Sequence, residues 1–308
     1  MLRAFFVGLS ENQSLRRFAE RSSLGRRVSG RFVAGTEISD AVRATQAVNR
    51  SSMSVSIDNL GENVTNPDEA RHSAQLYHRI LDAIAANQLN ANISLKLTHM
   101  GLDVYEKLAR EIVSGLVAQA ASMDPPGFIR VDMEGSPYTQ RTLDFVHELH
   151  RMPGNANSVG TVIQAYLKRS ERDIEKLLAE GIRIRLCKGA YKEPPEIAFE
   201  AKSEVDANYI KLMKILLKSG TYHGLATHDE NIIQQAEAFA TAQKISPDSF
   251  EFQMLYGIRR DLQQRLVREG WRVRIYIPFG TEWYPYFMRR LGERPANVLF
   301  ILRNLLRA

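Results

Sequence analysis

Apolar and polar residues alternate in short runs along most of the chain, and each run is followed by a longer segment with helical spacing. The clearest run is residues 271–280, WRVRIYIPFG, in which β-branched residues alternate with arginine and tyrosine. An alternation of period two predicts a strand, and Pro278 and Gly280 predict its end. A helix is expected next, with Pro285 in its first turn, where a missing backbone N–H removes no hydrogen bond.

The same rhythm begins near residue 51 and repeats along the chain. Seven earlier runs, each followed by a helical pattern, are MSVSIDNLGENV, NISLKLTHMG, GFIRVDMEG, SVGTVIQAY, GIRIRLCKGAY, YHGLATHDE and SFEFQMLYG. Eight strand–helix units over ~250 residues predict an α/β chain folded as a (β/α)8 TIM barrel. A doubly wound sheet of the Rossmann type is the alternative, but no GxGxxG motif follows an early strand. We therefore expect a barrel over residues 51–308.

Residues 1–50 precede this rhythm and are the most basic part of the chain. Their spacing predicts two or three helices broken at Gly25, Gly30 and Gly35. A segment rich in arginine and serine raises the alternative of a transit peptide, but the acidic residues within it argue against that class. We expect an arm of accessory helices that touches an anionic surface.

Composition limits the classes of function. The 308 residues include 41 Lys+Arg and 35 Asp+Glu, a formal charge of +6 that suits nucleic acid, an anionic membrane or anionic small molecules. Aromatic residues do not interleave with the basic arm, so no nucleic-acid partner is expected. Cys187 is the single cysteine, which excludes an internal disulfide, and no ligand spacing suggests a metal. No apolar run is long enough to span a bilayer, and a cytoplasmic setting is expected.

Polar side chains stand at the predicted end of nearly every strand. They are Asp58, Asn59, Lys96, Asp132, Glu134, Gln164, Arg185, Lys188, Thr227, His228, Gln253 and Tyr276. Catalytic groups of such barrels occupy the C-terminal strand ends, so we expect the site there.

Several of these residues allow more than one role. Lys96 suits a Schiff-base nucleophile, an anion-binding cation or an ion-pair partner of a carboxylate such as Asp132, which itself suits a general base or a structural partner. His228 suits a base, a cofactor hydrogen bond or a metal ligand, but no HxH or HExxH motif accompanies it. Arg185 and Lys188 flank a turn whose cations suit a phosphate or a reduced flavin ring.

The helix after the last strand carries a cluster of its own. Tyr286, Arg289, Arg290 and Glu293 are spaced by three and four residues, so they share one side of a helix. Two adjacent guanidiniums can clamp a planar anion such as a carboxylate. A solvated face with ordinary ion pairs is the alternative.

Together these motifs carry a family resemblance. The chain resembles the monofunctional bacterial proline dehydrogenases, which are distorted (β/α)8 flavoproteins, from about residue 50 to its end. The most specific motif is Y-x-x-R-R-x-x-E at 286–293. It is supported by SLKLTHMG, IRVDME, VIQAYL, RLCKGAY, ATHDE, EFQMLYG and RIYIPFG.

The resemblance implies a substrate site for L-proline and a site for FAD across the barrel mouth. The residues implied to bind substrate are Lys96, Arg289 and Arg290 at the carboxylate and Leu255, Tyr276 and Tyr286 around the ring. Asp132 would hold the basic residues in place, and Arg185 would stabilise the reduced flavin. The residues implied to contact FAD are Met133, Gln164, Arg185, Lys188, Gly189, Ala190, Thr227 and His228, with Glu293 fixing the helix near the flavin.

The implied reaction is hydride transfer from proline to flavin N5, which gives Δ1-pyrroline-5-carboxylate, the first step of proline catabolism to glutamate. Electrons would pass to quinone, and the protein would associate peripherally with the inner face of the membrane through its arm or the segment VLFILRNLL. The alternatives are oxidation of hydroxyproline or another cyclic amino acid, and a Schiff-base lyase that uses Lys96.

Overall fold

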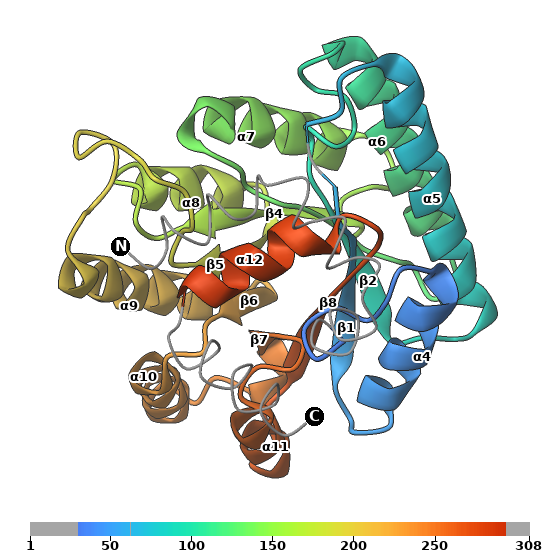
Figure 1. Cartoon of the computed structure of the whole chain (residues 1–308). Helices are drawn as coiled ribbons and strands as arrows, with labels where there is room; N and C mark the ends of the chain where they lie inside the picture. The colour runs from blue at the N-terminus through green and yellow to red at the C-terminus, as the bar shows by residue number, and fades with distance from the viewer. Residues whose placement is uncertain (1–29, 62, 294–308) are drawn as a thin grey trace.

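Eight parallel strands close into a barrel in chain order (Figure 1). This computed structural model describes residues 30–61 and 63–293. The strands are β1 Ser54–Asn59, β2 Ala91–Leu95, β3 Ile129–Val131, β4 Val159–Gln164, β5 Arg183–Cys187, β6 His223–Ala226, β7 Phe250–Leu255 and β8 Val273–Phe279. Seven strands lie within the runs that predicted them, and β2 begins one residue before its run; the (β/α)8 fold expected from the sequence is confirmed.

A helix follows each strand, and the helices surround the barrel (Figure 1). They are α5 Pro67–Ala86, α6 Glu106–Ser122, α7 Ser136–Arg151, α8 Ser170–Ala179, α9 Lys202–Lys218, α10 Glu230–Ala242, α11 Arg260–Arg268 and α12 Trp283–Glu293. A further helix, α4 Ile38–Asn49, precedes β1, and a 3-10 turn, Pro247–Ser249, precedes β7. Among the described helices, none combines the length and the apolar character needed to cross a membrane.

Local sequence explains where the helices begin. The side chain of Asn66 accepts a hydrogen bond from the backbone N–H of Glu69, and Pro67 occupies the first position of α5. Glu37 and Asp40 form a reciprocal capping box at the start of α4, just after the break predicted at Gly35. The predictions for residues 1–29, including a break at Gly25, and for VLFILRNLL lie outside the described residues.

On several strands, alternation separates an apolar outer face from a polar inner face. On β1, Val55 and Ile57 belong to the apolar core that the strands share with the helices. Ser56, between them, accepts a hydrogen bond from Arg185 on β5. These strands are not neighbours, so the contact passes through the barrel interior. The interior is therefore polar at this level, whereas Val, Ile and Leu usually fill it in barrels of this class.

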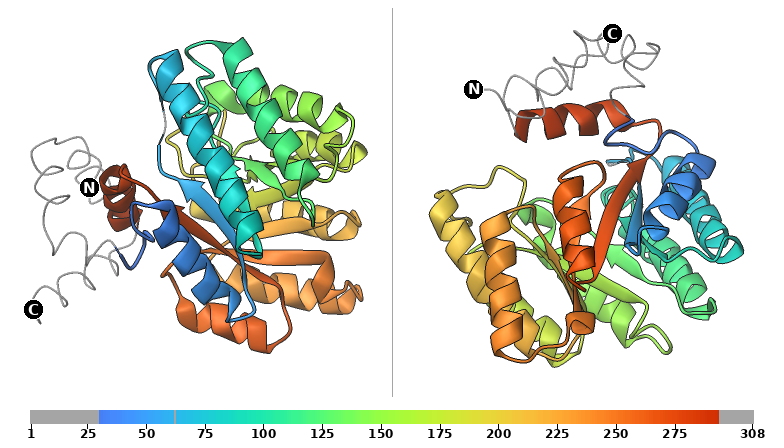
Figure 2. Two further views of the ribbon diagram at one scale, coloured as in Figure 1. Left: turned by 90° about the vertical axis from the view of Figure 1, so that its right-hand side faces the viewer. Right: turned by 90° about the horizontal axis from the view of Figure 1, so that it is seen from below.

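Helices α4 and α12 depart from the regular barrel arrangement. Helix α4 packs against the outside of β1 and β8, while α12 lies across the barrel end where β8 finishes (Figure 2). Trp283 and Phe287 of α12 share an apolar cluster with Phe32, Val33 and Leu60. The segment before α4 therefore helps to fasten α12 over the C-terminal strand ends. The separation of residues 1–50 from the barrel stays a prediction.

Strand β8 continues through Pro278, so the prediction that Pro278 ends it was wrong. Pro278 pairs with Asp58 of β1, and its carbonyl oxygen accepts a hydrogen bond from the N–H of Ala34 at 2.9 Å. Pairing of β8 with β7 ends at Tyr276. Beyond Tyr276, β8 has no pairing with β7 that would need an N–H from Pro278. The proline therefore removes no hydrogen bond between these strands, as is usual for a proline at the edge of a sheet.

Candidate functional site

Arg185 of β5 forms the centre of a hydrogen-bonded layer inside the barrel. Its Nη1 donates to Oδ1 of Asp132 at 2.7 Å, and its Nη2 donates to the hydroxyls of Ser56 and Ser94, each at 3.0 Å. Its Nε donates to Oε1 of Gln253. The guanidinium, 6% exposed as a residue, thus joins β5 to β1, β2, β3 and β7. These four hydrogen bonds fix its position.

Asp132 and Tyr276 extend this layer toward the barrel mouth. The hydroxyl of Tyr276 donates to Oδ2 of Asp132 at 3.1 Å, and the Arg185 guanidinium lies 5.2 Å from the centre of the Tyr276 ring. Burial first, and then the charges of Asp132 and Asp58, raise the pKa of Tyr276 well above its ordinary value. Tyr276 is therefore a neutral hydrogen-bond donor at neutral pH, and Asp132 orients two predicted site residues at once.

Lys96 forms an ion pair with Asp58, with Nζ 3.8 Å from Oδ2. The sequence analysis named Asp132 as an example of a carboxylate partner; the ion pair in the structure is with Asp58, on the neighbouring strand β1. Asp58 is only 1% exposed. Burial raises its pKa to about 6, although the charge of Lys96 opposes the rise.

Two features of the barrel mouth fit a flat, hydrogen-bonding ring such as a flavin. Gln164, at the end of β4, donates from Nε2 to the carbonyl oxygen of Glu134 at 2.8 Å, while its buried Oε1 has no donor among the described residues. A buried acceptor of this kind usually has a partner, and the imide N–H of a flavin is a suitable one. Gly189 has φ +115°, and a Cβ there would lie 2.2 Å from the Tyr166 ring. The loop after β5 therefore needs glycine to lie this close to Tyr166.

The other predicted cofactor residues lie in loops at the same end of the barrel. Lys188 binds Asp206 at 2.5 Å and Asp229 at 2.7 Å, so two carboxylates hold its ammonium group. His228 accepts at Nε2 from the N–H of Leu255 at 2.9 Å, which requires that its Nδ1 carries the proton when the ring is neutral. Thr227 is buried, and its hydroxyl accepts from the N–H of Asp229 at 3.0 Å.

The remaining predicted residues are placed with less detail. Met133 is buried after β3, Ala190 is exposed in the loop after β5, and Leu255 ends β7 half-buried. Tyr286 is buried in the cluster that fastens α12. Arg289, Arg290 and Glu293 belong to α12, but their side chains lie outside the described residues. The carboxylate clamp assigned to this helix stays a prediction.

The sequence analysis missed the deeper members of the polar layer. Ser56 and Ser94 received no role, and Asp58 and Gln253 were named only as polar strand ends. A usable signal was present, because Ser56 lies two residues before Asp58 and Ser94 two before Lys96, which puts each pair on one strand face. Within residues 30–61 and 63–293 no group of His, Cys, Asp and Glu could hold a metal ion.

The geometry suits orientation of a small polar molecule rather than nucleophilic attack. Lys96 provides a cation beside the mouth, Tyr276 a neutral hydroxyl and ring face, and Gln164 an acceptor for a ring N–H. Asp132, itself held by Arg185, fixes the hydroxyl of Tyr276. A carboxylate and a planar heterocycle could bind here together.

Comparison with known proteins gives consistent matches. The sequence profile of the family described as "Proline dehydrogenase" matches residues 41–303. The chain is 41% identical to "Proline dehydrogenase 1" of Bacillus subtilis (strain 168) over 308 residues, which covers all of both chains. It is 40% identical to the "Proline dehydrogenase" of Deinococcus radiodurans over 280 residues, 90% of this chain and 89% of that protein.

A solved structure has the same fold. Proline utilization A from Bdellovibrio bacteriovorus, inactivated by N-propargylglycine, superimposes with a TM-score of 0.80 at 25% sequence identity. The match covers 87% of this chain and 32% of that longer protein.

Proposed function

The chain belongs to the proline dehydrogenase family of oxidoreductases, and on this premise we propose that it oxidises L-proline to Δ1-pyrroline-5-carboxylate with bound FAD and passes the electrons to quinone. The observation that carries the proposal is the layer in which Arg185 and Asp132 hold Tyr276 at the mouth, with Lys96 directly after the end of β2. This layer offers a cation and a ring wall to a cyclic amino acid.

Lys96 would bind the carboxylate of proline together with Arg289 and Arg290. Charge-assisted contacts of this kind are stronger than neutral ones and fix orientation. Tyr276, Leu255 and Tyr286 would enclose the pyrrolidine ring and exclude water from it. Hydroxyproline or another cyclic amino acid is the alternative substrate, and the ratio of kcat/KM values for the two compounds distinguishes them.

Gln164 would bind the flavin ring through its buried Oε1, with Met133 beside the ring and the loop Gly189-Ala190 close to the cofactor. Thr227, His228 and Lys188 would contact its remaining parts from the ends of β5 and β6. When bound, FAD supplies the hydride acceptor, which no side chain can provide. Glu293 would fix α12 near the ring.

Arg185 and Asp132 act in this proposal mainly by position. The charge of Arg185 would favour an anionic reduced ring, and its four hydrogen bonds hold the guanidinium in a fixed position. One carboxylate oxygen of Asp132 accepts a hydrogen bond from Arg185, and the other accepts one from Tyr276. Peripheral attachment to the inner face of the membrane, where quinone is found, belongs to the same proposal.

An absorption spectrum tests the proposal directly. Purified protein should be yellow, with flavin bands that L-proline bleaches under anaerobic conditions and that a soluble quinone analogue restores. D-proline is the matched control, because it carries the same groups with the wrong hand. A colourless protein that added FAD cannot reconstitute would contradict the proposal.

A further inference from the structure

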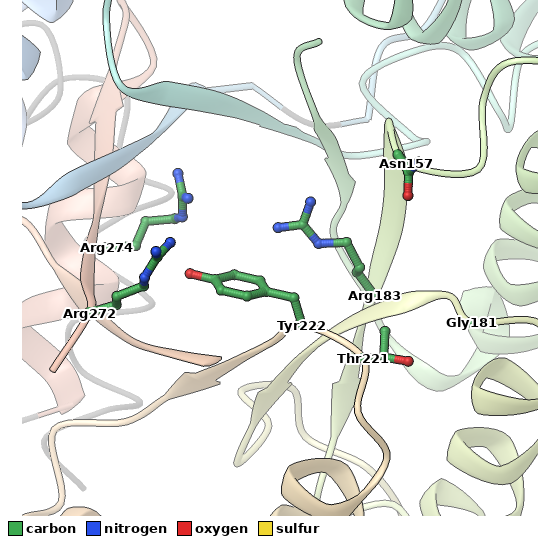
Figure 3. A pocket seen from close by; sticks show the side chains of 7 residues that line it. All are labelled: Asn157, Gly181, Arg183, Thr221, Tyr222, Arg272 and Arg274. Atoms are coloured by element: carbon green, nitrogen blue, oxygen red, sulfur yellow. The ribbon is translucent and has the colours of Figure 1, made fainter. Parts of the chain in front are cut away.

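A second polar cavity lies at the opposite end of the barrel, where β5, β6 and β8 begin. It has a volume of about 490 Å³, and its lining includes Arg183, Tyr222, Arg272 and Arg274. Figure 3 shows the three guanidiniums turned toward the space around the Tyr222 ring. The substrate site described above lies at the other end of the strands, so this cavity has no part in it.

Arg183 has no carboxylate partner in the part of the chain that the structure describes. Its guanidinium lies 4.2 Å from the centre of the Phe128 ring and 4.8 Å from that of Tyr222. Its Nε is buried without an acceptor among residues 30–61 and 63–293. Two aromatic faces hold the group flat, which leaves its N–H edges available to a ligand in the cavity.

Arg272 and Arg274 are each paired with one carboxylate. Nε of Arg274 donates to Glu251 at 2.6 Å, and Nε of Arg272 donates to Asp248 at 2.7 Å. Tyr222 donates its hydroxyl to the other oxygen of Glu251 at 2.8 Å. Glu251 accepts these two hydrogen bonds and a third from Nε2 of Gln253 at 2.6 Å, and its ion pair is with Arg274.

The region as a whole keeps an excess of positive charge. Arg130 lies beneath Arg183 and donates from Nη1 to its carbonyl oxygen at 2.6 Å. Burial, followed by the charges of Arg130 and Arg183, lowers the pKa of His223 to about 3, so this ring adds no charge at pH 7. Among the described residues, Arg272 and Arg274 form ion pairs with Asp248 and Glu251, whereas Arg130 and Arg183 form none.

We propose that this cavity binds a phosphate-type dianion, held by Arg183, Arg272 and Arg274. Arg183 on the cavity wall and Arg130 beneath it, neither with an ion-pair partner among the described residues, can balance the charge of a dianion. Guanidinium N–H pairs also match the oxygen spacing of a phosphate. The C-termini of the helices lie at this face, and their partial negative charge disfavours anions there. Any affinity for an anion therefore comes from the arginines. The site goes beyond proline oxidation and does not depend on it.

Calorimetric titration of the flavin-loaded protein with inorganic phosphate, at ionic strength held constant with sodium chloride, tests the proposal. We expect saturable binding, and Arg183→Gln should raise Kd about ten- to hundredfold through loss of a charge-assisted contact. Phosphate at about a hundredfold above Kd should raise the melting temperature by roughly 5 °C. The matched control is Arg172→Gln, an exposed arginine of α8 near the other end of the barrel.

A second variant, Arg272→Gln, covers the case in which Arg183→Gln does not fold; Arg272 is exposed, and its loss should also raise Kd. Vesicles of phosphatidylcholine with and without phosphatidic acid separate a lipid phosphate from the free ion. Binding to either source that weakens in an arginine variant but not in Arg172→Gln supports the site. Absence of binding to both sources, or equal affinity in all four proteins, would overturn it.

Discussion

At the scale of single residues, the pKa of Asp58 predicts how the stability of the protein depends on pH. Its pKa is raised from 3.8 to about 6 by burial, so the folded protein holds this proton more tightly than the unfolded chain. The free energy of unfolding should therefore fall as pH rises from about 4 to about 6, by about 3 kcal/mol from this group. Asp58→Asn lacks the ionisation, so relative to wild type it should be more stable at pH 7 than at pH 4.

Urea unfolding at pH 4, 5, 6 and 7 measures that difference. Asp144→Asn, which removes an exposed carboxylate from α7, is the control for general effects of charge. A constant difference between Asp58→Asn and wild type across this range would show that Asp58 titrates in the folded protein as it does in the unfolded chain.

The backbone conformation of Gly189 and its closeness to Tyr166 lead to a prediction about flavin binding. Alanine there would combine a positive φ with a Cβ only 2.2 Å from the Tyr166 ring, so the loop after β5 must move. We expect Gly189→Ala to weaken FAD binding at least about tenfold, measured as flavin lost on dilution. Gly220→Ala is the matched control, because Gly220 also has a positive φ but no atom within 4 Å of the added Cβ. Equal retention of flavin in both variants would contradict this reading of the loop.

Arg289 and Arg290 make a prediction that rests on sequence alone. If both grip the carboxylate of proline, Arg289→Met or Arg290→Met should raise KM about ten- to hundredfold while the flavin spectrum is kept. Arg268→Met, at the exposed end of α11, provides the control for loss of positive charge. An unchanged KM in both α12 variants would remove the clamp from the proposed mechanism.

At the scale of elements, helix α4 is the least expected part of the barrel wall. Ala41 and Thr45 are buried against β1 and β8, and Val48 packs beside them. Full burial of a valine or isoleucine side chain contributes roughly 1.5–3 kcal/mol, and Ile38, Val42 and Val48 of α4 are partly buried against the same core. A chain of residues 51–308 should therefore unfold at a clearly lower urea concentration than a chain of residues 30–308, which keeps α4.

Both chains can be compared with the full protein by fluorescence during urea unfolding. Ala41→Glu in the full chain makes the same test without truncation, because it places a charge against the barrel wall. If residues 51–308 are as stable as residues 30–308, the arm is separable, as the boundary near residue 50 predicts.

Local sequence predicts the elements well and their arrangement less well. Alternation located every strand, because one face of each is covered by helices and must be apolar. It misjudged the end of β8, since whether Pro278 interrupts a strand depends on a neighbour that the local sequence does not reveal. Local sequence also could not place α4, because the pattern of residues 38–49 does not indicate that this helix packs against β1 and β8.

At the scale of the whole molecule, the polar interior was the feature that sequence could not reveal. Arg185 and Arg274 stand at alternating strand positions, and such a pattern shows two faces without showing which one points inward. Closure of the sheet turns these faces into a shared interior, where a charge on β5 meets hydroxyls on β1 and β2. Site residues at strand ends were predictable from barrel geometry, while their partners depended on distances across the barrel.

Substitution of Arg185 tests whether the polar interior stabilises the barrel. In Arg185→Met the half-buried Asp132 and the buried side chains of Ser56, Ser94 and Gln253 would each lose a donor. Loss of one partner of a buried pair leaves the other charge uncompensated, so we expect the free energy of unfolding to fall by about 3–5 kcal/mol. Arg172→Met, at an exposed position, should change it by less than about 0.5 kcal/mol.

The double variant Arg185→Met with Asp132→Asn separates structure from chemistry. The second substitution removes the negative charge of Asp132 that Arg185→Met leaves without a partner. Part of the lost free energy of unfolding should therefore return, whereas proline turnover should not. Urea unfolding and kcat, both measured on flavin-loaded protein, give the two readouts. If Arg185→Met loses turnover but remains within about 1 kcal/mol of wild type, Arg185 serves the reaction and the barrel interior is held by its remaining hydrogen bonds.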